Sequence, residues 1–351
     1  MKLTTLRGRG AADNPRNRFE ALEVLPDPDA RDPEDTGPRT RLLRDATRTI
    51  LARNDSPDIG FNVSVNPYRG CEHGCIYCYA RPTHEYLGLS AGLDFETVIL
   101  VKTEAAALLR EALSSSRWQP EVIAMCGVTD PYQPVERRLR ITRGCLEVLT
   151  EFRNPVTIIT KNHLVARDID LLSELASFGA AQVMVSVTSL DEKLQRVMEP
   201  RTSIPAKRLE AIARLTAAGV PVGVMVAPVI PGLTDHEMPS ILAAAAEAGA
   251  VTAAMVPLRL PHGVADLFTD WLDRHFPDRK EKVLNRVRSM RGGRLNDGEF
   301  VKRMRGEGIW ADQIRAMFTT ARRRVGLDRP RSPLSIAAFR RPDRGGQLSL
   351  L

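Results

Sequence analysis

Three cysteines in the segment NPYRGCEHGCIYCYA are spaced as metal ligands, because Cys71, Cys75 and Cys78 form a C-x3-C-x2-C pattern. Three thiolates can bind three irons of a [4Fe–4S] cluster, whereas a cluster that only carries electrons normally has a fourth cysteine. The remaining iron is then open, and a small molecule can bind there and be polarised or reduced. The spacing therefore predicts a reactive iron–sulfur centre.

A structural zinc site is the alternative interpretation of this segment, with His73 or His84 as the fourth ligand. Zinc sites usually combine two close cysteine pairs, or one cysteine pair with a distant histidine pair, so the spacing favours the cluster. The chain has five cysteines, an odd number, which argues against a disulfide framework and for a reducing compartment.

Composition predicts a soluble cytoplasmic protein. The chain has 351 residues, of which 43% are hydrophobic, enough for one large core or two modest ones. The amino-terminal sequence MKLTTLRGRG is followed by no apolar stretch, so we expect neither a secretory signal nor a membrane anchor. The longest apolar runs, such as 220–230, are too short and too interrupted by proline to span a bilayer.

Positive charge is concentrated near the C-terminus. The formal net charge is +7, and residues 271–344 contain 20 Lys or Arg against 9 Asp or Glu, which leaves −4 for the rest of the chain. Such asymmetry is typical of a surface that binds a polyanion, and equally of an ordinary solvated helical face. Charge alone therefore leaves nucleic-acid binding open.

Short β-branched runs predict buried parallel strands at 61–65, 97–101, 121–125, 155–160, 182–187, 221–227 and 251–256. Helical spacing occurs between them in TEAAALLREAL, RGCLEVLTEF, RDIDLLSELASF, AKRLEAIARLTAAG and HEMPSILAAAAEAG. This order of strands and helices predicts an α/β fold with a parallel sheet closed, or partly closed, into a barrel. Active residues should then follow the C-terminal ends of the strands, where the loops meet at the barrel mouth.

The chain divides into four predicted regions. Prolines interrupt residues 1–60, which predicts an extended or partly disordered N-terminal arm. The core barrel occupies 61–262, and a basic helical extension follows at 263–328. Arg, Pro and Gly dominate after about residue 330, so we predict a disordered tail at 329–351.

The cysteine pattern, with aromatic Tyr77 before the third cysteine, resembles the signature of the radical S-adenosylmethionine superfamily. The resemblance implies a partial (β/α)6 barrel and two cofactors, a [4Fe–4S] cluster and S-adenosylmethionine. In that family the open iron binds the amino and carboxylate groups of S-adenosylmethionine. One electron then breaks the sulfonium bond, and the resulting 5′-deoxyadenosyl radical abstracts hydrogen from the substrate. An electron donor such as flavodoxin or ferredoxin is implied as a partner.

A narrower resemblance extends over residues 66–261, to the spore photoproduct lyase-like proteins, a group described as DNA repair photolyases. The matching segments are NPYRGCEHGCIYCYARPTHEYLG, GVTDPYQPVE, ITKN, VSVTSLD, APVIPGLTD and LRLP. Each falls at the end of a predicted strand, the position that the barrel requires. The sequence is similar to a separate branch of that group rather than to the lyase itself.

Five polar residues at predicted strand ends are candidates for binding S-adenosylmethionine. Thr129 and Asp130 offer acceptor oxygens to its ammonium group, and the resemblance places them at the family's amino-group site. Lys161 is suited to the carboxylate, while Ser186 and Thr188 are suited to ribose or carboxylate oxygens. The alternatives are a turn at Asp130 and a solvated lysine.

Catalytic roles for Cys126, Tyr77 and Tyr79 rest on the narrower resemblance. Spore photoproduct lyases use a hydrogen-donor cysteine in this neighbourhood, with tyrosines that match Tyr77 and Tyr79, and Tyr77 is also a candidate for binding the cofactor. Cys126 is one position further from the aspartate than in the lyases, which weakens the case for the same reaction. A cysteine at a strand end is also often a small buried hydrophobe.

The final residues Gln347–Leu351 resemble the short peptide with which bacterial DNA-processing proteins dock on the replication sliding clamp, with Leu351 in place of the more usual phenylalanine. A disordered apolar end is the alternative. Together with the basic region, this peptide suggests DNA as the substrate. The rival functions are radical chemistry on a small molecule or protein, and a non-catalytic nucleic-acid-binding protein with a structural zinc or iron–sulfur site.

Overall fold

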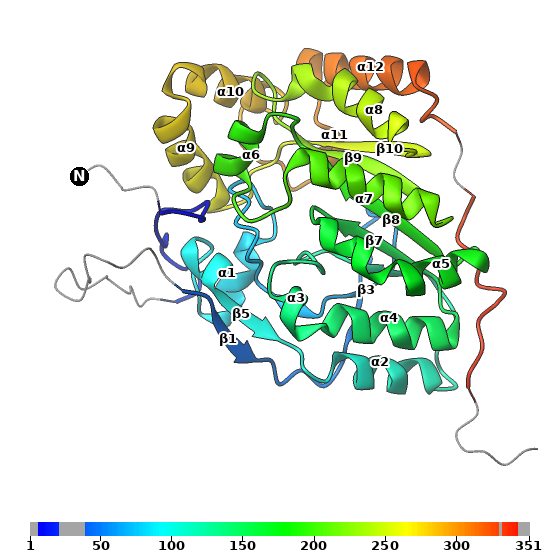
Figure 1. The fold of residues 1–351 in the computed structure, drawn as a ribbon. Coiled ribbons are helices and arrows are strands. Elements are labelled where there is room, and N and C mark those ends of the chain that lie inside the picture. Colours follow the sequence, from blue (N-terminus) through cyan, green and yellow to red (C-terminus); the bar gives the residue numbers. More distant parts are fainter. Residues whose placement is uncertain (1–5, 21–38, 330–331, 343–351) are drawn as a thin grey trace, which may run out of the picture.

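A computed structural model describes residues 6–20, 39–329 and 332–342. Its main sheet has the strand order β10-β9-β8-β7-β6-β3-β2, and the pairs from β3 to β10 are parallel. The parallel strands are β3 (Val63–Val65), β6 (Ile123–Met125), β7 (Val156–Thr160), β8 (Ala181–Ser186), β9 (Val222–Val229) and β10 (Thr252–Pro257). The prediction of a partial (β/α)6 barrel is confirmed (Figure 1).

A second, smaller sheet lies beside the barrel and corrects one predicted strand. It has the order β1-β5-β4, with bounds β1 (Arg41–Arg44), β5 (Val98–Val101) and β4 (Tyr68–Arg69). The expectation that 97–101 joins the barrel was therefore wrong, because an apolar run marks a buried strand without indicating its sheet. In the predicted N-terminal arm, β1 joins this sheet and β2 (Leu51–Arg53) pairs antiparallel with β3.

Five helices predicted between the strands are present and lie on the outside of the barrel (Figure 1). They are α2 (Ala105–Ser114), α4 (Ile141–Phe152), α5 (Ile169–Ser177), α7 (Pro205–Ala217) and α8 (Met238–Glu247). Shorter turns connect the rest: η2 (Arg81–Leu87), α1 (Leu93–Thr97), α3 (Glu136–Leu139), η3 (His163–Asp168), α6 (Glu192–Met198) and η4 (Asp235–Glu237). No helix within the described ranges has the length and apolar character needed to cross a bilayer.

The basic extension is helical and packs around the mouth of the barrel. It contains α9 (Val264–His275), α10 (Pro277–Ser289), α11 (Lys302–Arg305) and α12 (Gly308–Arg324). Phe268 and Trp271 of α9 share one buried cluster with Ile76 and Tyr77 of the cysteine loop. The extension therefore supports the predicted site directly, through apolar contacts that exclude water.

The tail prediction was wrong for residues 332–342, which follow the amino-terminal end of the barrel. The backbone N–H of Ser335 donates to the Gly179 carbonyl at 2.9 Å, and that of Arg340 to the Phe152 carbonyl at 2.9 Å. Phe339 packs against Phe152 with ring centroids 6.3 Å apart. One aromatic side chain and these backbone bonds anchor a segment that composition alone marks as disordered. The peptide Gln347–Leu351 lies outside the described residues.

Candidate active site

The cysteine loop follows β3 and β4, at the carboxyl end of the first barrel strand. The N–H of Cys71 donates to the Phe95 carbonyl at 2.9 Å, and the N–H of Cys78 donates to the Cys75 carbonyl at 3.2 Å. Ile76 donates its N–H to the Met198 carbonyl at 3.1 Å, which joins the loop to the end of α6. The loop is therefore fixed by backbone bonds at both ends and in its centre.

A buried ion pair between Arg81 and Glu96 fixes the cysteine loop in place. Arg81 and Glu96 are fully buried, with a guanidinium nitrogen 2.5 Å from a carboxylate oxygen. The same guanidinium donates to the Cys75 carbonyl at 2.9 Å. Glu96 also accepts the N–H groups of Gly10 and Ala11 at 3.0 and 2.9 Å. The N-terminal segment and the cysteine loop thus share one acidic side chain.

Gly74 shows how closely these pieces approach. Its φ of +65° lies in the left-handed region, and a Cβ built there would be 2.7 Å from a Glu96 carboxylate oxygen. A Cβ on Gly10 would be 1.9 Å from the Gly74 carbonyl oxygen. Both positions therefore need glycine, because any side chain would push the clamp apart.

The three thiols lie within electrostatic range of one another. Burial and then the neighbouring Cys71 raise the pKa of Cys78 to about 11. Burial also raises the pKa of Cys75 well above its ordinary value, with added contributions from Glu199, Cys78 and Cys71. Two buried cysteines and the partly buried Cys78, whose thiolates would repel one another, fit a group that supplies positive iron between them, as an iron–sulfur cluster does.

His73 and His84, the histidines of the zinc alternative, each contact another part of the protein. His73 Nδ1 lies 3.3 Å from a carboxylate oxygen of Asp130, and its Nε2 lies 3.1 Å from the Asn162 side chain. His84 Nε2 lies 2.9 Å from the Val98 carbonyl. In the part of the chain that the structure describes, no group of three or more His, Cys, Asp or Glu side chains is arranged so that it could hold a single metal ion. Cluster ligands bind separate irons, so they need not meet at one ion.

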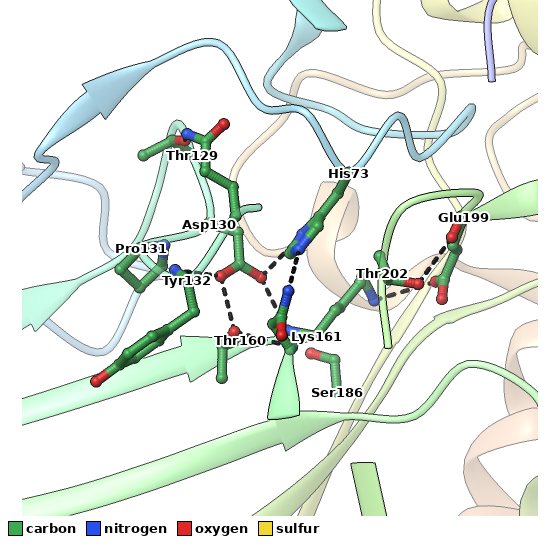
Figure 2. Close-up of polar contacts among 12 residues, drawn as sticks. His73, Thr129, Asp130, Pro131, Tyr132, Thr160, Lys161, Ser186, Glu199 and Thr202 are labelled. Atoms are coloured by element: carbon green, nitrogen blue, oxygen red, sulfur yellow. Dashed lines mark hydrogen bonds and ion pairs between the residues drawn. The ribbon is translucent and has the colours of Figure 1, made fainter. Parts of the chain in front are cut away.

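The Asp130 carboxylate joins several segments at the barrel mouth through hydrogen bonds, as Figure 2 shows. One of its oxygens accepts from the Thr160 hydroxyl at 2.7 Å and from the Tyr132 N–H at 2.8 Å. The other accepts from the Lys161 N–H at 2.8 Å and faces His73. Burial alone would lower the pKa of His73, but Asp130 and Cys71 together outweigh it and raise that pKa to about 10. These contacts occupy Asp130, and its role at the cofactor ammonium stays a prediction.

Glu199 is the centre of a second polar network, beside the cysteine loop. It accepts from the hydroxyls of Tyr77 and Thr188 and from the Arg208 guanidinium. The Lys161 ammonium lies 3.4 Å from it. Burial works against ionisation, but Arg208 and Lys161 outweigh it and hold the pKa of Glu199 well below its usual range. A buried carboxylate therefore balances two buried cations.

The other predicted cofactor-binding residues lie around this network. The Lys161 ammonium donates to the Thr188 hydroxyl at 3.2 Å and to the Ala227 carbonyl at 2.8 Å, so the ends of three strands meet at one point. Ser186 is buried, and its hydroxyl has no hydrogen-bond partner among the described residues. Thr129 donates to the Gly70 carbonyl at 2.7 Å, beside the cysteine loop. All of these side chains lie at the mouth, and their roles stay predictions.

Tyr79 and Cys126 come together at the same mouth. The Tyr79 hydroxyl donates to the carbonyl of Gly127, next to Cys126, at 2.9 Å, while 49% of the tyrosine stays exposed. Cys126 is buried, and burial followed by the Asp130 charge raises its pKa to about 12. This thiol therefore stays protonated at neutral pH. By contrast, Cys145 lies on the buried face of α4 and is fully buried in the core.

Sequence reasoning missed three charged residues of this region: Glu96, Glu199 and Arg259. Glu199 lies between α6 and α7, away from any strand end, so no strand rule finds it. Arg259 was within reach, because it follows β10 in the segment LRLP. Its guanidinium lies 4.7 Å from the centre of the Tyr79 ring.

A partial parallel barrel with three clustered cysteines after its first strand defines an enzyme class that binds its cofactors at the mouth. The family model of the radical SAM superfamily matches residues 65–245. The chain belongs to this superfamily. The family implies a [4Fe–4S] cluster and S-adenosylmethionine.

Curated relatives share the sequence over part of their length. An uncharacterised protein of Mycobacterium bovis is 41% identical over 220 residues, which cover 62% of this chain and 65% of that protein. The chain thus spans just under two thirds of the relatives it matches.

Solved structures with this fold include spore photoproduct lyase. One variant of that enzyme has a TM-score of 0.57 and 16% identity, and the match covers 82% of this chain and 80% of the other. Another variant was solved with bound AdoMet and dinucleoside spore photoproduct, with a TM-score of 0.54, 15% identity and coverage of 81% and 77%. At this identity the likeness concerns the fold alone.

Proposed function

We propose that this protein reductively cleaves S-adenosylmethionine at a [4Fe–4S] cluster bound by Cys71, Cys75 and Cys78. When bound, the cluster and S-adenosylmethionine together supply a 5′-deoxyadenosyl radical that abstracts hydrogen from the substrate. The observation that carries the proposal is the packing of Cys78 against the clusters that contain Cys71 and Cys75, in a loop that the Arg81–Glu96 pair fixes at the barrel mouth. Such a loop holds its ligands in place before the cluster enters.

The residues around the loop have separate tasks in this proposal. Lys161 would donate to the carboxylate of S-adenosylmethionine, and the Ser186 hydroxyl would bond its ribose. Glu199 holds Lys161 and the Tyr77 hydroxyl in place. Trp271 and its apolar neighbours keep water from the cysteine loop. Cys126, with a protonated thiol beside Tyr79, can return a hydrogen atom to a substrate radical.

A nucleic acid is the substrate class that we propose. The solved structure with bound dinucleoside spore photoproduct, although distant in sequence, has its fold in common with this chain. In the basic helical extension, α9 and α10 pack beside the cysteine loop, where the extension can contact phosphates. Docking of Gln347–Leu351 on a sliding clamp, and reduction by flavodoxin or ferredoxin, belong to the same proposal. The proposed regions are an N-terminal arm, a core barrel at 61–262 and the extension at 263–328.

Anaerobic reconstitution with iron and sulfide, followed by reduction in the presence of S-adenosylmethionine, tests the proposal. We expect about four irons per chain and formation of 5′-deoxyadenosine, measured by chromatography. Cys75→Ala should abolish the product, because one iron loses its ligand. Cys145→Ala removes a core thiol away from the mouth and should leave the product unchanged. Bound zinc without product, or full activity of Cys75→Ala, contradicts the proposal.

A further inference from the structure

Arg259 is a half-buried cation at the barrel mouth, and no described carboxylate forms an ion pair with it. Among the residues that the structure describes, its guanidinium makes no hydrogen bond or ion pair. Its contact is with Tyr79, whose ring centre lies 4.7 Å away. Burial of a charged group without a partner is costly, so such a group is usually completed by a ligand.

A second arginine, Arg291, adds to the positive charge near Arg259. Arg291 is buried, and it donates to the carbonyls of Leu258 and Lys302 at 3.0 and 2.7 Å. Burial and then the nearby Arg259 lower the pKa of Arg291 to about 10. Neither contact supplies negative charge. The two arginines therefore repel each other across the end of β10.

The nearby acid is already engaged. Both carboxylate oxygens of Asp58 accept from the guanidinium of Arg303, at 2.8 and 2.6 Å, and Asp58 also accepts the Val301 N–H at 3.0 Å. This bidentate pair uses the oxygens that could otherwise serve Arg259. Arg259 and Arg303 thus share Asp58, while the acid near Arg291 is Asp297.

The orientation of Arg259 suits an anion. A guanidinium that stacks on an aromatic face keeps its N–H donors at its edge, where a planar or tetrahedral oxyanion can accept two of them. The same Tyr79 hydroxyl bonds Gly127, next to Cys126. An oxyanion on Arg259 would therefore lie close to the candidate hydrogen donor.

We propose that Arg259, stacked on Tyr79, is a phosphate-binding subsite that positions a nucleic-acid backbone at the barrel mouth. The inference rests on the proposed function, whose substrate class it makes specific. The bound phosphate supplies the negative charge that pairs with the Arg259 guanidinium. The neighbouring extension, rich in Lys and Arg, contributes long-range attraction, and Arg259 contributes position.

Binding of a labelled single-stranded DNA oligonucleotide to the reconstituted full chain tests this subsite. Anisotropy titrations at several salt concentrations give the affinity and its salt slope. Arg259→Gln should weaken binding about tenfold and reduce the slope of log K against log salt by about one. Arg259→Lys should keep the slope and lose part of the affinity, because lysine is a point charge. Arg117→Gln, an exposed arginine in the loop before β6 at the other end of the barrel, should change neither.

Each other outcome has a defined meaning. Unchanged affinity and slope in Arg259→Gln overturn the subsite and leave the proposed function standing. A raised KM for S-adenosylmethionine with unchanged DNA binding overturns it too, and assigns Arg259 to the cofactor carboxylate. If the wild-type protein forms 5′-deoxyadenosine but binds no oligonucleotide, the nucleic-acid substrate fails together with the subsite.

Discussion

Arg81 and Arg259 both lie beside the cysteine loop, and they differ in what surrounds them. Arg81 is fully buried, pairs with Glu96, and donates further to the carbonyls of Cys75 and Ala91. Arg259 is half-buried and stacks on Tyr79 without a hydrogen bond to any described residue. Arg81 holds protein segments together, whereas in our proposal Arg259 pairs with an external anion.

The same contrast separates two regions of the mouth. On the side of Arg81 and Arg208, each buried guanidinium has a carboxylate, from Glu96 or Glu199. On the side of Arg259, the carboxylate of Asp58 is already paired with Arg303, and Arg259 and Arg291 repel each other. Full pairing indicates a scaffold whose charges balance internally. An excess of unpaired arginines indicates a surface that can bind an external anion.

The largest effect is expected from breaking the scaffold pair. Glu96→Gln leaves Arg81 charged, buried and without a counter-ion, so the free energy of unfolding should fall by about 4 kcal/mol. Iron content after reconstitution should fall with it, because the loop loses its clamp. Urea denaturation and iron analysis measure both. Glu104→Gln, at an exposed carboxylate 3.6 Å from Arg44, is the control and should change stability by less than about 0.5 kcal/mol.

A somewhat smaller loss is expected at Glu199. Glu199→Gln removes the charge shared by Arg208 and Lys161, but its amide oxygen can still accept a hydrogen bond. Unfolding should therefore become easier by about 3 kcal/mol, measured in the same urea titrations. A loss near zero would mean that this network is not part of the scaffold, and the contrast between the two regions would fail on its paired side.

Little change in stability is expected at Arg259. Arg259→Met loses the contact with the Tyr79 ring but also removes repulsion from Arg291, so unfolding should change by less than about 1 kcal/mol. Arg81→Met in the same assay should cost several times more. If the two variants are equally destabilised, Arg259 is structural, and the distinction between the regions is wrong.

The smallest effect concerns acid. Hydrogen bonds from Arg303 lower the pKa of Asp58 from 3.8 to about 2. A lowered pKa means that the pair stabilises the fold above about pH 4 and that this contribution disappears as the pH falls toward 2. Asp58→Asn should therefore flatten the loss of stability over that interval, as followed by thermal unfolding. An unchanged acid profile would show that the pair contributes nothing.

The sequence predicts the parts of this site that follow strand ends. Lys161, Ser186 and Thr188 end β7 and β8, and a parallel barrel brings such positions together whatever the loops do. Glu96 and Glu199 could not be found in this way, because they lie in α1 and after α6 and reach the site through long-range contacts. Acidic residues are usually exposed, so composition assigns them to the surface.

The errors in the fold have related causes. The apolar run of β5 is buried as expected, but its partners β1 and β4 are short and polar, so nothing in their sequence announces a second sheet. Residues 332–342 attach through Phe339, through backbone bonds, and through the guanidinium groups of Arg340 and Arg341, which donate to backbone carbonyls. These contacts follow no helical or strand period, so periodicity carries no signal for them.

The N-terminal segment reaches Glu96 across a separation of 86 residues. Closing so long a loop costs entropy before its contacts form, so we expect this segment to dock late in folding, after α1 is in place. A chain shortened to begin after Ala11 would still carry every cysteine. Its cysteine loop, however, would close over a carboxylate that has lost two backbone donors. Gly10 and Ala11 therefore help to hold the cysteine loop in place, and removing them should weaken it.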